Sequence, residues 1–233
     1  VAKQQGGNSF KFFTSHMQEV FDQHHWLVKH FHVALEQQQF EVYYQPIVEL
    51  ATRQIHKAEA LIRWKHPERG YISPAEFIPV AEDTQKIHAI GNWVFDQAMQ
   101  QVKHWRQRFH PAFQISVNKS PIQIANELTG NTDWISRLQA MQLPGNCLVV
   151  EITEGVLMDS QSHILEKLLA MRDAGIQVAI DDFGTSYSSM SYLKKFDIDY
   201  LKIDQSFTRN LAPGNSDHAL SEAIVMMAHK LGL

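Results

Sequence analysis

Two adjacent aspartates, Asp181 and Asp182, end the short apolar run QVAIDDF and are followed by a glycine and a cluster of hydroxyl residues. Four other β-rich runs also carry a polar residue inside the strand or at its C-terminal end. These residues are Glu59 in KAEALIRW, Asn118 in ISVN, Glu151 in LVVEITE and Lys202 in YLKID. Burying a polar group without a partner is costly, so the repeated pattern predicts that these side chains share one site.

The predicted site is rich in hard oxygen donors. Its members are Glu59, Asn118, Glu151, Asp181 and Asp182, without histidine or cysteine, and such a set suits Mg²⁺ or Mn²⁺ better than zinc. Divalent cations would also remove the conflict between carboxylates that are buried together. Because adjacent aspartates diverge from one turn, one of them could bridge two ions while the other holds only the second. A two-metal site of this kind suits in-line displacement at phosphorus.

Two cations accompany the acidic residues, and each has two interpretations. Lys202 could orient an attacking water or stabilise charge on a phosphate oxygen, or it could form a salt bridge with Asp204 or Asp199. Its position within a strand favours the first role. Arg63 is expected to project from the acidic face of its strand, where it could bind a phosphate through two hydrogen bonds. Its alternative is a surface ion pair with Glu68.

The elements that must position these residues alternate along the chain. Strands are predicted at 40–50, 55–64, 113–118, 148–154, 177–183 and 200–204, with amphipathic helices at 89–107, 133–142, 163–175 and 218–232. The alternation indicates an α/β fold, either a doubly wound sheet or a barrel. In a (β/α)₈ barrel all C-terminal strand ends meet at one mouth, whereas a doubly wound sheet gathers only those beside its switch point. Polar ends on five strands favour the barrel.

Composition excludes several classes of protein. The chain has 233 residues, of which 44% are hydrophobic and 20% charged, and its net charge of −4 gives no basic field for nucleic acid. The single cysteine, Cys147, excludes a disulfide within the chain and is interpreted as a core residue of a cytoplasmic protein. No run approaches the roughly 20 apolar residues that cross a bilayer, so no membrane contact is expected of this segment.

The first 39 residues differ in character from the rest. A glycine-containing turn and a short aromatic strand precede one long helical pattern, interpreted as a connecting helix over 15–39. This pattern contains His24, His25, His30 and His32. No two of them stand four residues apart, which is the spacing of a zinc-binding helix. We therefore predict a solvated or interface helix rather than a metal site.

The polar runs together resemble a known family. KAEALIRW, ISVNKS, EITE, DDFGTSYSS and YLKID are similar, in order and spacing, to the successive motifs of the EAL-domain cyclic di-GMP phosphodiesterases, from about Phe40 to the last residue. The resemblance implies a (β/α)₈ TIM-like barrel, often with an antiparallel first strand. It also implies hydrolysis of cyclic di-GMP to linear pGpG in bacterial second-messenger signalling, dependence on Mg²⁺ or Mn²⁺, inhibition by Ca²⁺, and a homodimer formed through the barrel.

The resemblance also implies a role for each motif residue. One metal would be held by Glu59, Asn118, Glu151 and Asp181, with Asp181 and Asp182 shared toward a second. Lys202 resembles the lysine that positions the attacking water, and Glu154 resembles the glutamate that holds the loop after Asp182; a helix N-terminal position is the simpler reading of Glu154. Positions that usually contact the guanine base or phosphate of the substrate are matched by Gln45, Leu61 and Arg63.

Two departures from the family pattern affect the prediction. Ser186 stands where the family usually has a second glycine in the loop after the paired aspartates, which would stiffen that loop. The family pattern also continues with a strand that bears a further glutamate and a final strand that bears a glutamine. We therefore expect the barrel, assigned to 40–233, to lack its last two strands in this sequence. Residues 1–14 resemble the end of a GGDEF (diguanylate cyclase-type) domain.

Two other functions remain open at this point. The first is a non-catalytic cyclic di-GMP receptor, but such receptors have usually lost metal ligands that this sequence keeps. The second is an unrelated barrel enzyme that uses a divalent metal, for example to stabilise an enediolate. That reading explains the acidic residues but not Arg63 or the ordered series of motifs.

Overall fold

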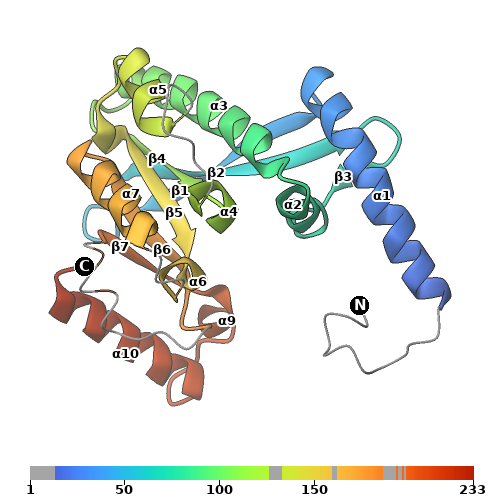
Figure 1. The fold of residues 1–233 in the computed structure, drawn as a ribbon. Coiled ribbons are helices and arrows are strands. Elements are labelled where there is room, and N and C mark those ends of the chain that lie inside the picture. The colour runs from blue at the N-terminus through green and yellow to red at the C-terminus, as the bar shows by residue number, and fades with distance from the viewer. Residues whose placement is uncertain (1–13, 126–132, 159–161, 186–192, 194–195, 197) are drawn as a thin grey trace. The chain divides into compact units, whose positions relative to one another are not determined.

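The computed structural model describes residues 14–125, 133–158, 162–185, 193, 196 and 198–233 (Figure 1). Its strands are β1 Phe40–Val48, β2 Ile55–His66, β3 Gly70–Ile72, β4 Gln114–Asn118, β5 Leu148–Thr153, β6 Gln177–Phe183 and β7 Tyr200–Ile203. Its helices are α1 Ser15–Glu36, α2 Pro74–Asp83, α3 Ile87–Arg108, α4 Pro121–Ala125, α5 Trp134–Ala140, α6 Glu154–Met158, α7 Ser162–Asp173, α9 Gln205–Thr208 and α10 Ser216–Leu231, with a 3₁₀ turn, η2, at Gly145–Cys147. The six predicted strands and the long predicted helices are all present. No described helix has the length and apolar character needed to span a membrane.

The strands form one sheet in the order β1-β2-β4-β5-β6-β7, and β3 pairs with the end of β2. The pairs β2–β4, β4–β5, β5–β6 and β6–β7 are parallel, as expected for strands joined by helical crossovers. The register places Asn118 opposite Glu151 and Thr153 opposite Asp181. The carboxyl ends of the parallel strands therefore bring the predicted polar residues to one edge.

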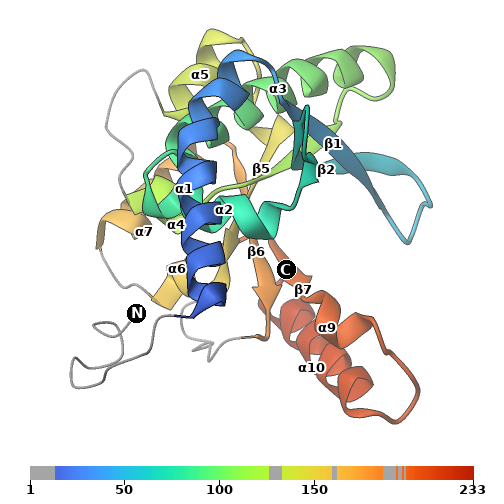
Figure 2. The same cartoon turned by 90° about the vertical axis from the view of Figure 1, so that its right-hand side faces the viewer.

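Helices cover the sheet through apolar faces with a period of 3.6 residues. α3 packs on β4 and α7 packs on β6, while α9 and α10 lie side by side next to β7 (Figure 2). The core between these layers includes Phe95, Met99, Ile115 and Val150, all fully buried. Cys147 is also fully buried, as predicted, and burial raises the pKa of its thiol to about 11.

The end of α7 is fixed by a glycine. Gly175 has a φ of +79°, a conformation that glycine adopts without strain. Its N–H donates to the carbonyl of Arg172 at 2.7 Å, and the next N–H, of Ile176, donates to Met171 at 2.9 Å. These bonds satisfy carbonyls that the helix end would leave free and turn the chain directly into β6.

A second glycine, Gly145 in η2, permits a close approach to this helix end. A Cβ atom at Gly145 would lie 1.9 Å from the carbonyl oxygen of Ala174, a backbone atom that cannot move aside cheaply. We expect Gly145→Ala to lower the free energy of unfolding by about 1–3 kcal/mol. Chemical denaturation measures this change. Gly155→Ala is the matched control, because a Cβ there meets nothing within 4 Å; a loss of equal size in both variants would contradict the explanation.

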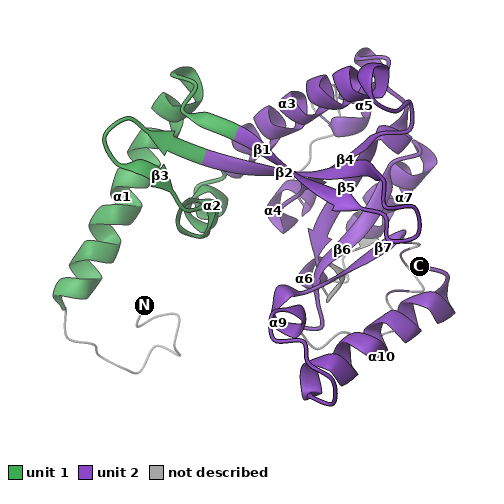
Figure 3. Ribbon diagram, turned by 180° about the vertical axis from the view of Figure 1, so that it is seen from behind, with its two compact units in different colours: residues 1–41, 64–86 green, residues 42–63, 87–233 purple. Residues whose placement is uncertain are grey.

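The described residues divide into two compact units, one formed by 1–41 and 64–86 and the other by 42–63 and 87–233 (Figure 3). In the first unit, α1 buries Phe31 beside Trp64, with ring centroids 5.4 Å apart. His30 stacks on Trp26 at 4.0 Å and meets the buried His66 edge-on at 5.7 Å. Among the described residues, no group of metal-ligating side chains includes a histidine of α1.

Candidate metal site

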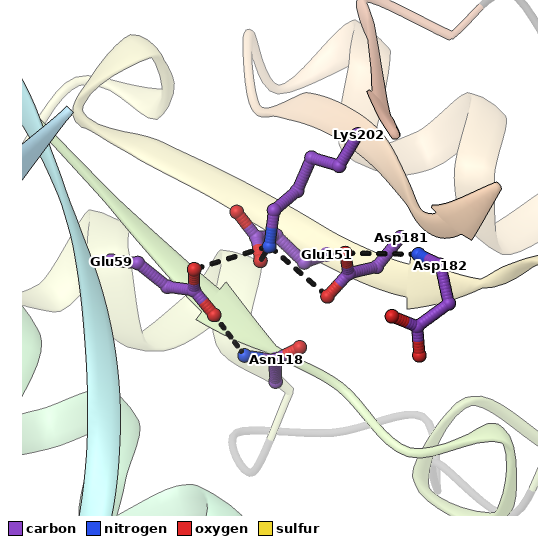
Figure 4. Close-up of polar contacts among 6 residues, drawn as sticks. All are labelled: Glu59, Asn118, Glu151, Asp181, Asp182 and Lys202. Carbon is purple, nitrogen blue, oxygen red and sulfur yellow. Dashed lines mark hydrogen bonds and ion pairs between the residues drawn. The ribbon is translucent and has the colours of Figure 1, made fainter. Parts of the chain in front are cut away.

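Three carboxylates meet at the C-terminal side of the second unit's strands (Figure 4). They belong to Glu59 on β2, Glu151 on β5 and Asp181 on β6, and one oxygen of each lies within 4.8 Å of the others. The ammonium of Lys202, on β7, donates to Glu59 Oε2 at 3.1 Å, Glu151 Oε2 at 2.5 Å and Asp181 Oδ2 at 3.0 Å. A lysine has three N–H donors, so all of them are used here. The alternating face of each strand thus brings residues far apart in sequence onto one cation.

Asn118 and Asp182 lie beside this group. Asn118 Nδ2 donates to Glu59 Oε1 at 2.9 Å, and the Asp182 N–H donates to Asp181 Oδ1 at 2.9 Å. Asp182 has a φ of +52°, which is uncommon for any residue other than glycine and marks a strained turn at the site. Its carboxylate is exposed and points away from Lys202 (Figure 4). Partial loss of hydration beside the protein raises the pKa of Asp182, and the neighbouring Asp181 and Asp204 add to this effect.

The clustered carboxylates create a negative potential that favours a positive charge among them. Burial raises the pKa of Glu151 to about 7 against the opposing field of Lys202, and the charges of Glu59 and Asp181 add to the rise. Burial by itself would lower the pKa of Lys202, but the surrounding carboxylates outweigh it and raise that pKa. The Glu151 side chain is only 1% exposed, so water does little to stabilise its charge. Carboxylate oxygens at this spacing, with that of Glu151 buried and the other two partly exposed, could hold a metal ion that prefers hard ligands.

A pocket of about 380 Å³ opens onto these residues, which is within the usual size range of ligand sites. It is lined by Gln45, Pro46, Ile47, Lys57, Glu59, Glu151, Ala179, Tyr200, Leu201 and Lys202. Gln45 therefore lies with the acidic group, whereas Leu61 and Arg63 are not among the lining residues. Both continue along the face of β2 that carries Glu59, and the Arg63 guanidinium donates to the Ile62 carbonyl at 2.9 Å.

Lys57 and Tyr200 line the same pocket, although the sequence interpretation did not select them. The Lys57 ammonium lies 3.5 Å from the centroid of the Tyr200 ring, at the distance of a cation–π contact. Burial lowers the pKa of Lys57 to about 8, so most of the population remains charged at pH 7. The period of two could have identified both residues, because each precedes a motif residue, Glu59 or Lys202, by two positions.

Glu154 is buried at the start of α6, directly after β5. Its Oε2 accepts the N–H of Gly184 at 3.3 Å, so it contacts the segment just beyond Asp182. This contact is the one that holding the loop would need, and the position at the helix start is the one that the simpler interpretation would need, so the role of Glu154 stays a prediction. Ser186 lies outside the described residues.

Within the part of the chain that the structure describes, Lys202 forms no salt bridge with Asp204 or Asp199. Asp199 instead accepts the Val178 N–H at 2.8 Å, and Asp204 accepts the Ser206 N–H at 2.9 Å at the start of α9. The ion pairs of Lys202 run to the three carboxylates. Lys202 therefore belongs to the acidic group, and its role toward water or a phosphate oxygen stays a prediction.

Residues 29–233 match the model of the EAL domain family. The chain belongs to this family. It is 39% identical over 236 residues to the bifunctional diguanylate cyclase/cyclic di-GMP phosphodiesterase MucR of Pseudomonas aeruginosa, covering 100% of this chain and 34% of that one. It is 35% identical over 233 residues to the cyclic di-GMP phosphodiesterase PdeR of Escherichia coli, covering 100% and 35%. The EAL chain thus spans about a third of the length of these curated relatives.

Solved structures agree with the EAL assignment. The PaMucR phosphodiesterase in complex with c-di-GMP matches with a TM-score of 0.82 and 38% identity, over 89% of this chain and 84% of that chain. The fold is therefore the TIM-like barrel of EAL domains, as the sequence predicts. Along the described residues the strand order runs from β1 to β7 without a pairing between these two.

Proposed function

We propose that this EAL chain is part of a metal-dependent phosphodiesterase that hydrolyses cyclic di-GMP to linear pGpG. The observation that carries the proposal is the convergence of Glu59, Glu151 and Asp181 on Lys202 at the mouth of a pocket. Relatives named as cyclic di-GMP phosphodiesterases support the choice of substrate. The reaction adds one water to one of the two phosphodiester bonds and opens the ring.

The acidic group would hold Mg²⁺ or Mn²⁺. Glu59, Glu151 and Asp181, with the amide oxygen of Asn118, would bind one ion, and Asp181 with Asp182 would face a second. A bound divalent cation supplies Lewis acidity toward a phosphate oxygen and makes water more acidic. We expect Ca²⁺ to inhibit, because it prefers ligand distances of about 2.3–2.6 Å against about 2.0–2.1 Å for Mg²⁺.

The chain's own residues then have separate tasks. Lys202 holds the carboxylates in place and would direct the attacking water through its ammonium. Gln45 in the pocket, and Leu61 and Arg63 farther along β2, would contact the guanine base or a phosphate. Glu154 would hold the loop after Asp182 through the Gly184 N–H. Orientation by such fixed groups lowers the barrier because little rearrangement is needed during the reaction.

The proposal extends to the organisation of the protein. Residues 1–14 would end a GGDEF-like domain, 15–39 would connect it to the barrel, and 40–233 would form the barrel domain, which pairs with a second copy. MucR, a relative named as both cyclase and phosphodiesterase, aligns with all of this chain and supports such a succession. The reducing environment of the cytoplasm would suit the free thiol of Cys147.

The test is hydrolysis of cyclic di-GMP by the purified protein, followed by chromatography of pGpG. We expect turnover with Mn²⁺ or Mg²⁺ and its loss on chelation with EDTA, restored by added Mn²⁺. Glu151→Gln is the control for adventitious activity, because it removes the most buried carboxylate of the group while keeping its size. Tight binding of cyclic di-GMP by calorimetry without any turnover would contradict the proposal and favour the receptor function instead.

A further inference from the structure

Lys57 and Tyr200 form a second contact across the interior of the second unit, next to the acidic group. Lys57 precedes Glu59 by two residues on β2, and Tyr200 precedes Lys202 by two residues on β7. Alternate residues of a strand face the same side and are spaced by about 7 Å. The contact of Lys57 with Tyr200 therefore lies one layer before the contact of Glu59 with Lys202, and all four residues line one pocket.

The Tyr200 ring is held in place by a set of polar contacts. Its hydroxyl donates to Gln177 Oε1 at 3.2 Å, and Gln114 Nε2 donates to the same oxygen at 2.5 Å. Gln177 Nε2 in turn donates to Asp199 Oδ1 at 3.3 Å. Because the ring is fixed, the Lys57 ammonium, 3.5 Å from the ring centroid, has a defined position one layer before the carboxylates along the strands.

Lys57 adds a second positive charge to the field of the acidic group. Its charge interacts favourably with Glu151 and Asp199 and unfavourably with Lys202. Three carboxylates share the Lys202 ammonium, so they retain an excess of negative charge that Lys57 partly offsets. A fixed positive charge one layer away also repels any divalent cation that those carboxylates bind.

We propose that Lys57 is a positioning residue that sets the affinity of the acidic group for a divalent cation. The ammonium, fixed on the Tyr200 ring, stabilises the carboxylates of the metal-free protein and weakens the binding of the ion. This inference rests on the metal site proposed above. It predicts that the ion binds more tightly when the charge of Lys57 is removed.

Calorimetric titration with Mn²⁺ at pH 7 tests this effect, and thermal melting in EDTA shows that each variant is folded. Lys57→Met removes the charge and keeps the chain length, and we expect it to bind Mn²⁺ about tenfold more tightly. Lys57→Arg keeps the charge and the cation–π contact and is expected to bind Mn²⁺ within about twofold of the unmodified protein. A residue that only fills space would leave Mn²⁺ binding unchanged when its charge is removed.

Lys57→Gln is a second uncharged variant, for use if the methionine variant does not fold. If the unmodified protein binds Mn²⁺ and neither uncharged variant binds it more tightly, the role of Lys57 is overturned while the metal site stands. If the unmodified protein itself does not bind Mn²⁺, the proposed metal site is overturned instead.

Discussion

Asp181→Asn is expected to lower the rate of cyclic di-GMP hydrolysis by about a thousandfold, equivalent to about 4 kcal/mol of transition-state stabilisation. Asp181 is the carboxylate in contact both with the Lys202 ammonium, at 3.0 Å, and with the Asp182 N–H, at 2.9 Å. Asparagine retains one oxygen that can accept the N–H bond, so the turn can persist. The substitution removes the negative charge that would bind the cation and that forms an ion pair with Lys202.

Steady-state kinetics with Mn²⁺ at saturating concentration measure this loss, and calorimetry shows whether Mn²⁺ binding weakens in parallel. Asp173→Asn is the matched control, because Asp173 is exposed and forms an ion pair with the adjacent Arg172. The control should retain the activity of the unmodified protein. An Asp181→Asn variant within about tenfold of that activity would show that Asp181 does not hold the reacting centre.

The main strands and the acidic site were predictable because two signals coincide in them. Apolar β-rich runs are buried on both faces in parallel sheets, so a polar residue such as Glu151 inside one of them stands out. The carboxyl ends of parallel strands then gather such residues without any further information. Glu59, Glu151, Asp181 and Lys202 meet as this reasoning predicts.

Other features depend on contacts that no local pattern encodes. β3 has three residues and pairs antiparallel with the end of β2, and so short a run carries no periodicity. α2 contains Pro79, which reads as a helix breaker, yet Phe77 and its neighbours are buried strongly enough to keep the helix. A helix there follows from tertiary packing rather than from propensity.

The cation–π contact of Lys57 was likewise hidden in the sequence. A lysine near the start of a strand is typical of an exposed edge, and a strand tyrosine is ordinary. Their partnership joins β2 and β7, which are not neighbours in the sheet order, so it depends on how the interior closes. Arg63 does not line the pocket because it lies four residues beyond Glu59, about 13 Å farther along β2.

Lys202→Met is expected to lower the free energy of unfolding in EDTA by about 3 kcal/mol, and most of this loss should disappear with saturating Mn²⁺. Removing one partner of a buried ion pair leaves the other charges without compensation, which typically costs about 3–5 kcal/mol. We take the lower end because the Lys202 side chain is 29% exposed, so water screens part of the interaction. An added cation would replace the missing positive charge and bind only the folded state.

Denaturant unfolding in EDTA and in Mn²⁺ provides the two measurements, with Lys103→Met as the control for loss of an exposed lysine on α3. The control should unfold as the unmodified protein does in both conditions. Hydrolysis by Lys202→Met should stay about a hundredfold lower even with saturating Mn²⁺, because the added ion restores charge but not the group that directs the water. Equal destabilisation in EDTA and Mn²⁺ would mean that Lys202 supports packing rather than the charge balance of the acidic group.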